Sequence, residues 1–129
     1  MVKIDAAIGT QHYRVDIKTA TNTLIADEPQ SIGGEDLGFS PDELLAASLG
    51  ACTSATLRMY ADRKGWTELK EIAVSVTFSR EGGRSSIQRE ISFTGDLTEE
   101  QRQRLLEIAE KCPVHRTLSN PVAIKTLVR

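Results

Sequence analysis

A single long helix is encoded by residues 40–65, SPDELLAASLGACTSATLRMYADRKG. Ser40 at the N-cap, Pro41 at the first helical position and Glu43 completing a capping box begin this helix. Cations in its last turn and a glycine directly after that turn end it. Because residues 46–55 carry no charge and almost no bulk, we expect the helix to be buried nearly all round and to pack closely on another helix.

Strands are expected on both sides of this helix in the sequence, because apolar and polar residues alternate there with a period of two. The expected strands span residues 2–7, 12–17, 23–26, 72–78, 86–95 and 122–128, with a glycine-rich loop at 31–39, a hairpin turn at 81–84 and a second helix that opens with a capping box at 98–101. The loop lacks the glycine and lysine spacing of phosphate-binding loops. Since consecutive strands mainly form hairpins, the pattern predicts an α+β fold in one domain, residues 1–129.

Charge is balanced along the chain. There are 16 Lys and Arg against 18 Asp and Glu, giving a formal net charge of −2, and there is no long run of like charges. This balance argues against a nucleic-acid partner and against a polybasic membrane patch. No stretch approaches the roughly 18 apolar residues of a membrane span, and residues 1–20 lack the pattern of a signal peptide, so we expect a cytoplasmic protein.

Two cysteines are the candidates for chemistry. Cys52 lies in the uncharged part of the long helix, and Cys112 lies on the apolar face of the second helix. Pro113 either breaks that helix or begins a following turn at 114–119; in the second case Cys112 sits at a helix N-terminus, which favours its thiolate. Cys112 and His115 form a single C-x-x-H, which is half of a zinc site at best. The alternative is that both cysteines are small buried apolar residues.

Burial alone would raise the pKa of Cys52 and leave the thiol inert, so a reactive Cys52 needs a cation from elsewhere in the chain. Arg14 is the first choice, because the alternation of its strand points it away from the apolar side chains. Arg89 interrupts the apolar side of the strand at 86–95, and we expect it at an edge position beyond the core. The other candidate arginines are Arg58, Arg84 and Arg116.

Asp42 and Glu43 are candidate acids for the same site, with the alternative that they only stabilise the helix N-terminus. Asp42 precedes Cys52 by ten residues, which is about 15 Å along a helix, so the two cannot touch within one chain. If two copies of the helix cross antiparallel near Ala47, residue 42 of one helix falls beside residue 52 of the other. If one of these acids acts at Cys52, the active site is therefore expected at a dimer interface.

Three motifs stand in the order known from one protein family. They are residues 27–36, DEPQSIGGED, residues 39–52, FSPDELLAASLGAC, and residues 112–114, CPV. On these motifs the chain resembles the OsmC/Ohr family of peroxiredoxin-like proteins. The resemblance implies an intertwined homodimer in which curved antiparallel sheets pack around two central helices, with a thiol site at the interface and no metal or organic cofactor.

The resemblance also implies reduction of hydroperoxides, preferentially organic ones. Cys52 would attack the peroxide oxygen and become a sulfenic acid, Cys112 would join it in an intramolecular disulfide, and a dithiol reductant, lipoyl-type in related proteins, would reduce that disulfide. The family's glutamate aligns with Asp42, and Glu43 follows directly, so either acid fits. Arg14 matches the family's arginine by strand position rather than by motif. The segment after Cys52 looks like the broad OsmC-like branch of the family.

From the residues and the resemblance together we predict a cytoplasmic, homodimeric, thiol-dependent peroxidase of oxidative-stress defence. In its site an arginine lowers the pKa of Cys52 and an acid orients that arginine. The alternatives are a non-catalytic dimeric protein that binds a small apolar ligand, and a thioester-handling cysteine enzyme.

Overall fold

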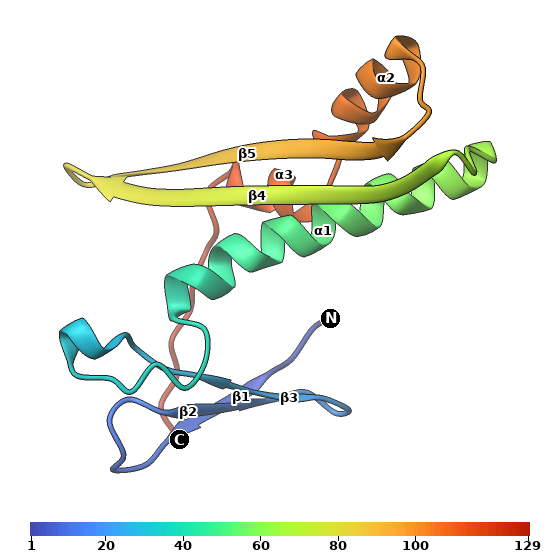
Figure 1. The fold of residues 1–129 in the computed structure, drawn as a ribbon. Helices are drawn as coiled ribbons and strands as arrows, with labels where there is room; N and C mark the ends of the chain where they lie inside the picture. Colours follow the sequence, from blue (N-terminus) through green and yellow to red (C-terminus); the bar gives the residue numbers. More distant parts are fainter. The chain divides into compact units, whose positions relative to one another are not determined.

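The computed structural model describes all 129 residues, which divide into two compact units, Met1–Leu45 and Ala46–Arg129 (Figure 1). The first unit holds a three-stranded sheet, and the second holds a two-stranded sheet with most of the helical residues. Both sheets are antiparallel. The chain is therefore an α+β protein, as the order of the sequence patterns predicts.

The sheet of the first unit has the order β1-β2-β3, with β1 at Asp5–Ile8, β2 at Val15–Lys18 and β3 at Thr23–Ala26. The first two strands start later than their sequence patterns predict. Arg14 therefore lies directly before β2 instead of inside a strand, which corrects the expected strand at 12–17. Its guanidinium group pairs with the Asp16 carboxylate, at 3.2 Å from Nη2 to Oδ1.

Asp27 organises the loop that follows β3. Its carboxylate is 2% exposed and accepts hydrogen bonds from the backbone N–H groups of Leu37, Glu28, Tyr13 and Glu35, at 3.1, 2.7, 3.0 and 3.2 Å. Burial disfavours the charged form, but these four hydrogen bonds outweigh it and lower the pKa of Asp27. One buried carboxylate thus ties distant parts of this unit together.

The glycines of the same loop allow two close approaches of backbone to backbone. A Cβ at Gly34 would collide with the carbonyl of Glu28, and a Cβ at Gly38 would collide with the carbonyl of Ile25. A short 3-10 helix, η1 at Gln30–Ile32, lies within the loop. The glycines of the predicted loop therefore allow its backbone to pack closely against neighbouring backbone.

Helix α1 spans Pro41–Lys64, with the bounds that its capping signals predict. The Ser40 N–H donates to Glu43 Oε1 at 2.8 Å, and the Glu43 N–H donates to Ser40 Oγ at 3.2 Å, which is the expected capping box. Gly65 follows with φ of 70°, a left-handed conformation that suits glycine after a helix end.

A long hairpin follows α1, with β4 at Leu69–Glu81 and β5 at Arg84–Gly95. Gly82 and Gly83 form its turn with φ values of 56° and 77°, as a tight hairpin turn requires. Alternate residues of both strands are half-buried, which confirms the predicted period of two. Helix α2 (Glu99–Ala109) then opens with the predicted capping box, and α3 (Pro113–Leu118) follows it.

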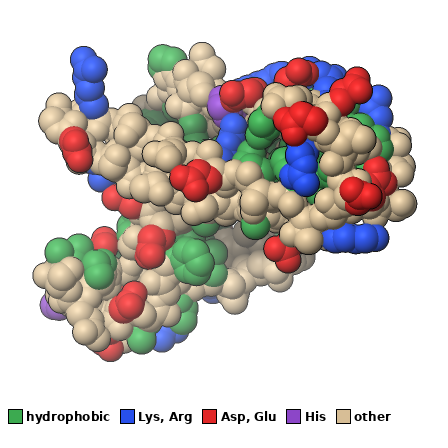
Figure 2. Space-filling view, turned by 45° about the horizontal axis from the view of Figure 1, so that its top comes forward, with side chains coloured by type: hydrophobic (Ala, Val, Ile, Leu, Met, Phe, Trp, Pro, Cys, Tyr) green, Lys and Arg blue, Asp and Glu red, His purple; other side chains and the backbone are tan.

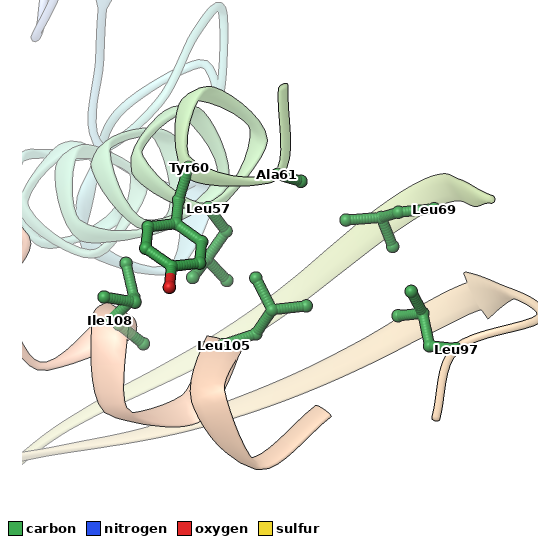
Figure 3. Packing of buried hydrophobic residues seen from close by; sticks show 8 residues of the cluster. Leu57, Tyr60, Ala61, Leu69, Leu97, Leu105 and Ile108 are labelled. Atoms are coloured by element: carbon green, nitrogen blue, oxygen red, sulfur yellow. The ribbon is translucent and has the colours of Figure 1, made fainter. Parts of the chain in front are cut away.

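The core of the second unit forms where α1, α2 and the open end of the hairpin meet. Figure 3 shows Leu57 and Tyr60 of α1 pointing toward Leu105 and Ile108 of α2. The remaining members of this buried cluster are Ala61, Leu69, Leu97 and Ala109. Burial of these side chains, at roughly 25 cal/mol per Å² of apolar area, stabilises the packing of both helices.

Two expectations about the second unit are wrong. Residues 120–129 form no strand, although 122–128 has a strand pattern, because no other strand of the chain pairs with them. In the middle of α1 only one face is buried, through Leu49 and Thr53, while Ser48, Ala51 and Ala55 stay exposed. Burial all round the helix is therefore not reached within one chain.

On the face shown in Figure 2, acidic and basic side chains are interspersed, and neither sign gathers in one large patch. This distribution matches the nearly balanced composition. None of the helices combines the length and the apolar character needed to cross a membrane.

Candidate active site

The structure brings the two cysteines together within the second unit. Cys52 is half-buried in α1, and Cys112 is fully buried at the N-cap of α3. Both thiols are free, and they lie near enough to each other that each shifts the pKa of the other. Pro113 takes the first position of α3, which is the second of the two outcomes that the sequence left open.

The surroundings of Cys52 favour its thiolate. Burial raises the pKa of Cys52, but hydrogen bonds from the Cys112 thiol, the Val114 backbone N–H and the Thr56 hydroxyl more than offset this effect, so the pKa is lowered. The Thr56 Oγ1 lies 4.0 Å from the sulfur, one helical turn further along α1. The groups that lower this pKa are uncharged donors, whereas the sequence predicts a cation in this role.

Cys112 has the opposite shift. Burial makes the largest contribution and raises the pKa of Cys112, and the hydrogen bond and charge of Cys52 raise it further. The N–H groups of His115 and Val114 lower this pKa, but by less than the other effects raise it. The N-terminal N–H groups of α3 thus favour the Cys112 thiolate as expected, but burial and the neighbouring Cys52 outweigh them. The site therefore pairs one thiol whose pKa is lowered with one whose pKa is raised.

Arg89 lies beside this pair, not at an edge beyond the core. It is opposite Val76 in the β4–β5 register, and its side chain is only 12% exposed. Nη1 donates to Thr53 Oγ1 at 3.0 Å and to the Ala109 carbonyl at 3.4 Å. The sequence contains a signal for this buried position, because an arginine among the apolar residues of a strand needs buried hydrogen-bond partners. The sequence does not identify these partners, since they lie 36 and 20 residues away along the chain.

His115 and Glu110 complete the surroundings of Arg89. Arg89 Nη2 lies 3.1 Å from His115 Nδ1 and 3.5 Å from Glu110 Oε2, and His115 Nε2 lies 3.0 Å from the same Glu110 oxygen. An arginine only donates, so Nδ1 accepts, and the proton of a neutral His115 lies on Nε2, facing Glu110. Both ring nitrogens of His115 thus have a partner within the chain. No group of three or more His, Cys, Asp or Glu side chains is arranged so that it could hold a metal ion.

Three predicted site residues lie in the other unit. Arg14 pairs with Asp16 before β2, Asp42 lies in the first turn of α1, and Glu43 forms the capping box with Ser40. The contribution of these three residues to the cysteine site stays a prediction.

Comparison with known proteins gives a consistent result. A family model described as OsmC-like protein matches residues 33–127. Among solved structures, the chain is similar to an OsmC-like protein from Mycoplasma pneumoniae, with a TM-score of 0.78 and 21% identity over 92% of this chain and 87% of that chain. A search of curated proteins finds no match to the sequence.

Two further solved structures are similar. One is an organic hydroperoxide resistance protein OsmC from Legionella pneumophila, with a TM-score of 0.70 and 21% identity over 92% of this chain and 88% of that chain. The other is the organic hydroperoxide resistance protein OhrB of Bacillus subtilis, with a TM-score of 0.61 and 24% identity over 91% of this chain and 89% of that chain. At such identities the similarity shows a shared fold.

Proposed function

The chain belongs to the OsmC-like protein family, and from this premise we propose that it is a thiol-dependent peroxidase that reduces hydroperoxides, organic ones in particular, in oxidative-stress defence. The observation that carries the proposal is the proximity of Cys52 and Cys112, whose pKa values are shifted in opposite directions. Two structural relatives that are described as organic hydroperoxide resistance proteins support the substrate class.

The first step uses Cys52 as the nucleophile. Its thiolate attacks one oxygen of the hydroperoxide, the O–O bond breaks, and the other oxygen takes up a proton and leaves as an alcohol. Cys52 is oxidised to a sulfenic acid. The lowered pKa of Cys52 supports this role, because the thiolate and not the thiol is the nucleophile.

The second step uses Cys112. Its sulfur attacks the Cys52 sulfenic acid, a disulfide forms, and the proton of the Cys112 thiol leaves with the hydroxyl group as water. A dithiol reductant, for which a lipoyl-type compound is the candidate, then reduces the disulfide and becomes a disulfide itself. The cycle needs no metal or organic cofactor.

The proposal includes residues from the first unit. Arg14 provides a cation near the Cys52 thiolate, and Asp42 or Glu43 orients that cation. Because Asp42 is ten residues away from Cys52 in one helix, the acid comes from a second copy of the chain in a homodimer. In this proposal residues 1–129 form one OsmC-like domain that is completed by dimerisation in the cytoplasm.

Two features support dimerisation. The small side chains of Ser48, Ala51 and Ala55 lie exposed on one face of α1, where another helix can approach closely. The segment 122–128 has a strand pattern but no strand partner, and Val122 and Ile124 are 62% and 87% exposed. Sedimentation equilibrium checks the state: we expect a dimer, and a monomer at every concentration would contradict it.

Intact-mass measurement after one equivalent of an organic hydroperoxide tests the peroxidase. The wild-type chain should lose two hydrogens, C112S should gain oxygen on Cys52, and C52S should stay unchanged. Two free thiols in the wild type after long exposure would overturn the proposal and favour a protein that binds an apolar ligand. An acyl group trapped on Cys52, with no response to peroxide, would instead indicate thioester chemistry.

A further inference from the structure

We propose that Arg89 is a positioning residue that holds the segments carrying Cys52 and Cys112 in register, so that their disulfide forms before Cys52 is oxidised further. This inference rests on the proposed peroxidase function. It concerns only residues of the second unit, and it gives a role to a buried cation that the two chemical steps do not use.

The position of Arg89 limits what it can do. It lies at the centre of the half-buried face of β5, between Ile87 and Ile91 in the alternation, with Val76 opposite on β4. A guanidinium group in such a place is unfavourable unless its donors are satisfied. The role of Arg89 therefore follows from its hydrogen-bond partners as well as from its buried position.

One end of the guanidinium group contacts the neighbours of both cysteines. Nη1 donates to Thr53 Oγ1 at 3.0 Å, and Thr53 follows Cys52 directly in α1. The Thr53 hydroxyl donates in turn to the Leu49 carbonyl at 2.7 Å, so it is fixed from two sides. Nη1 also lies 3.4 Å from the carbonyl of Ala109, the last residue of α2 and close to Cys112.

The other end contacts α3. Nη2 lies 3.1 Å from His115 Nδ1, and His115 stands in the first turn of α3, three residues after Cys112 at its N-cap. Glu110 holds both partners, because its Oε2 lies 3.5 Å from Arg89 Nη2 and 3.0 Å from His115 Nε2. A single side chain thus braces α1 beside Cys52 and α3 beside Cys112.

Such a brace matters for the second step of the reaction. A disulfide forms only within a narrow range of separations and torsion angles, so the two segments must keep their register. The competing reaction consumes a second hydroperoxide: the Cys52 sulfenic acid takes up another oxygen to become a sulfinic acid, and an alcohol leaves. Loss of register slows disulfide formation and leaves the competing reaction unaffected.

The test compares R89M, R89K and the wild type, with R84M as the matched control at the exposed hairpin turn. Rapid-quench intact mass follows loss of the Cys52 thiol and formation of the disulfide separately, with equimolar and excess organic hydroperoxide. For R89M we expect unchanged thiol loss, disulfide formation slowed by roughly tenfold or more, and sulfinic acid in excess peroxide. R89K should lie between R89M and the wild type, because one ammonium group keeps the charge and cannot span all the partners.

Disulfide formation at the wild-type rate in folded R89M would overturn the proposal. If circular dichroism shows that R89M does not fold, T53V and H115L remove single partners of Arg89 while keeping most of the volume. Slower disulfide formation in both variants supports the proposal, and wild-type rates in both overturn it.

A separate oxidant distinguishes this inference from the peroxidase proposal. A small aromatic disulfide first forms a mixed disulfide with Cys52 and releases one thiol, and Cys112 then displaces the second thiol as the internal disulfide forms. If the wild type ignores hydroperoxides, the peroxidase proposal fails. Slower ring closure in R89M under these conditions still supports the positioning role, and equal ring closure overturns it.

Discussion

Cys112 at the start of α3 lies near Cys52 in the middle of α1, and this proximity couples the two thiols. It lowers the pKa of one cysteine and raises the pKa of the other. The coupling can be removed by one substitution, which makes its effect on Cys52 measurable.

Replacing Cys112 with alanine should raise the pKa of Cys52, because the thiolate loses a hydrogen-bond donor. At neutral pH the Cys52 thiolate fraction falls and alkylation slows. C112S, which keeps an O–H donor, should lie closer to the wild type. The rate of iodoacetamide reaction as a function of pH checks this, and a common midpoint for all three proteins would contradict it.

Leu57→Ala should destabilise the second unit by about 2 to 5 kcal/mol, because Leu57 is fully buried between α1 and α2 and leaves a cavity when shortened. Met59→Ala is the control on the same helix, since Met59 is 62% exposed, and we expect a change within about 0.5 kcal/mol. Equilibrium unfolding in urea measures both. Similar midpoints for the two variants would show that the cluster contributes little.

Gly38→Ala should destabilise the first unit by about 1 to 3 kcal/mol, because its methyl group collides with the Ile25 carbonyl and the backbone must shift. Gly9→Ala is the control, since a Cβ there meets nothing within 4 Å. Amide hydrogen exchange of β3 reports the local stability. Equal protection in both variants would contradict the close approach.

Asp27→Asn should remove a pH-dependent part of the stability. Because the pKa of Asp27 is lower in the folded than in the unfolded chain, its stabilisation is complete above the unfolded pKa and is lost as pH falls through the folded pKa. The wild type should therefore lose more stability than D27N between neutral and acidic pH. Thermal unfolding across this range measures the difference, and parallel curves would exclude the role of Asp27.

Local signals predicted much of the fold. The bounds of α1 follow from Ser40, Pro41 and Gly65, and the long hairpin follows from its alternation and its two turn glycines. Such features act between residues a few positions apart, so the sequence carries them directly. The prediction of a strand at 122–128 was wrong because strand formation also depends on residues far away in the sequence. A pattern shows which residues suit a strand but not whether a partner strand exists.

The sequence singled out Cys52 and Cys112 as candidates, and their roles stay a prediction; it did not predict the groups that surround them. Residue type and helix position were enough to single out Cys52 and Cys112. Which of the two has the lower pKa depends on how burial compares with the hydrogen-bond donors Val114 and Thr56, and on the fold that brings these groups together. Arg89 was misplaced because its partners come from three separate helices and their connections.

The opposite shifts of the two cysteines mean that Cys52 loses its proton at a lower pH than Cys112, so that between the two pKa values the pair holds one proton, on Cys112. In a peroxidase cycle, the hydroxyl group that leaves Cys52 as water needs a proton, and the Cys112 thiol already holds it beside that sulfur. In the proposed cycle the buried Cys112 thiol would therefore supply this proton itself as the sulfur–sulfur bond forms, and no acid would have to enter from solvent.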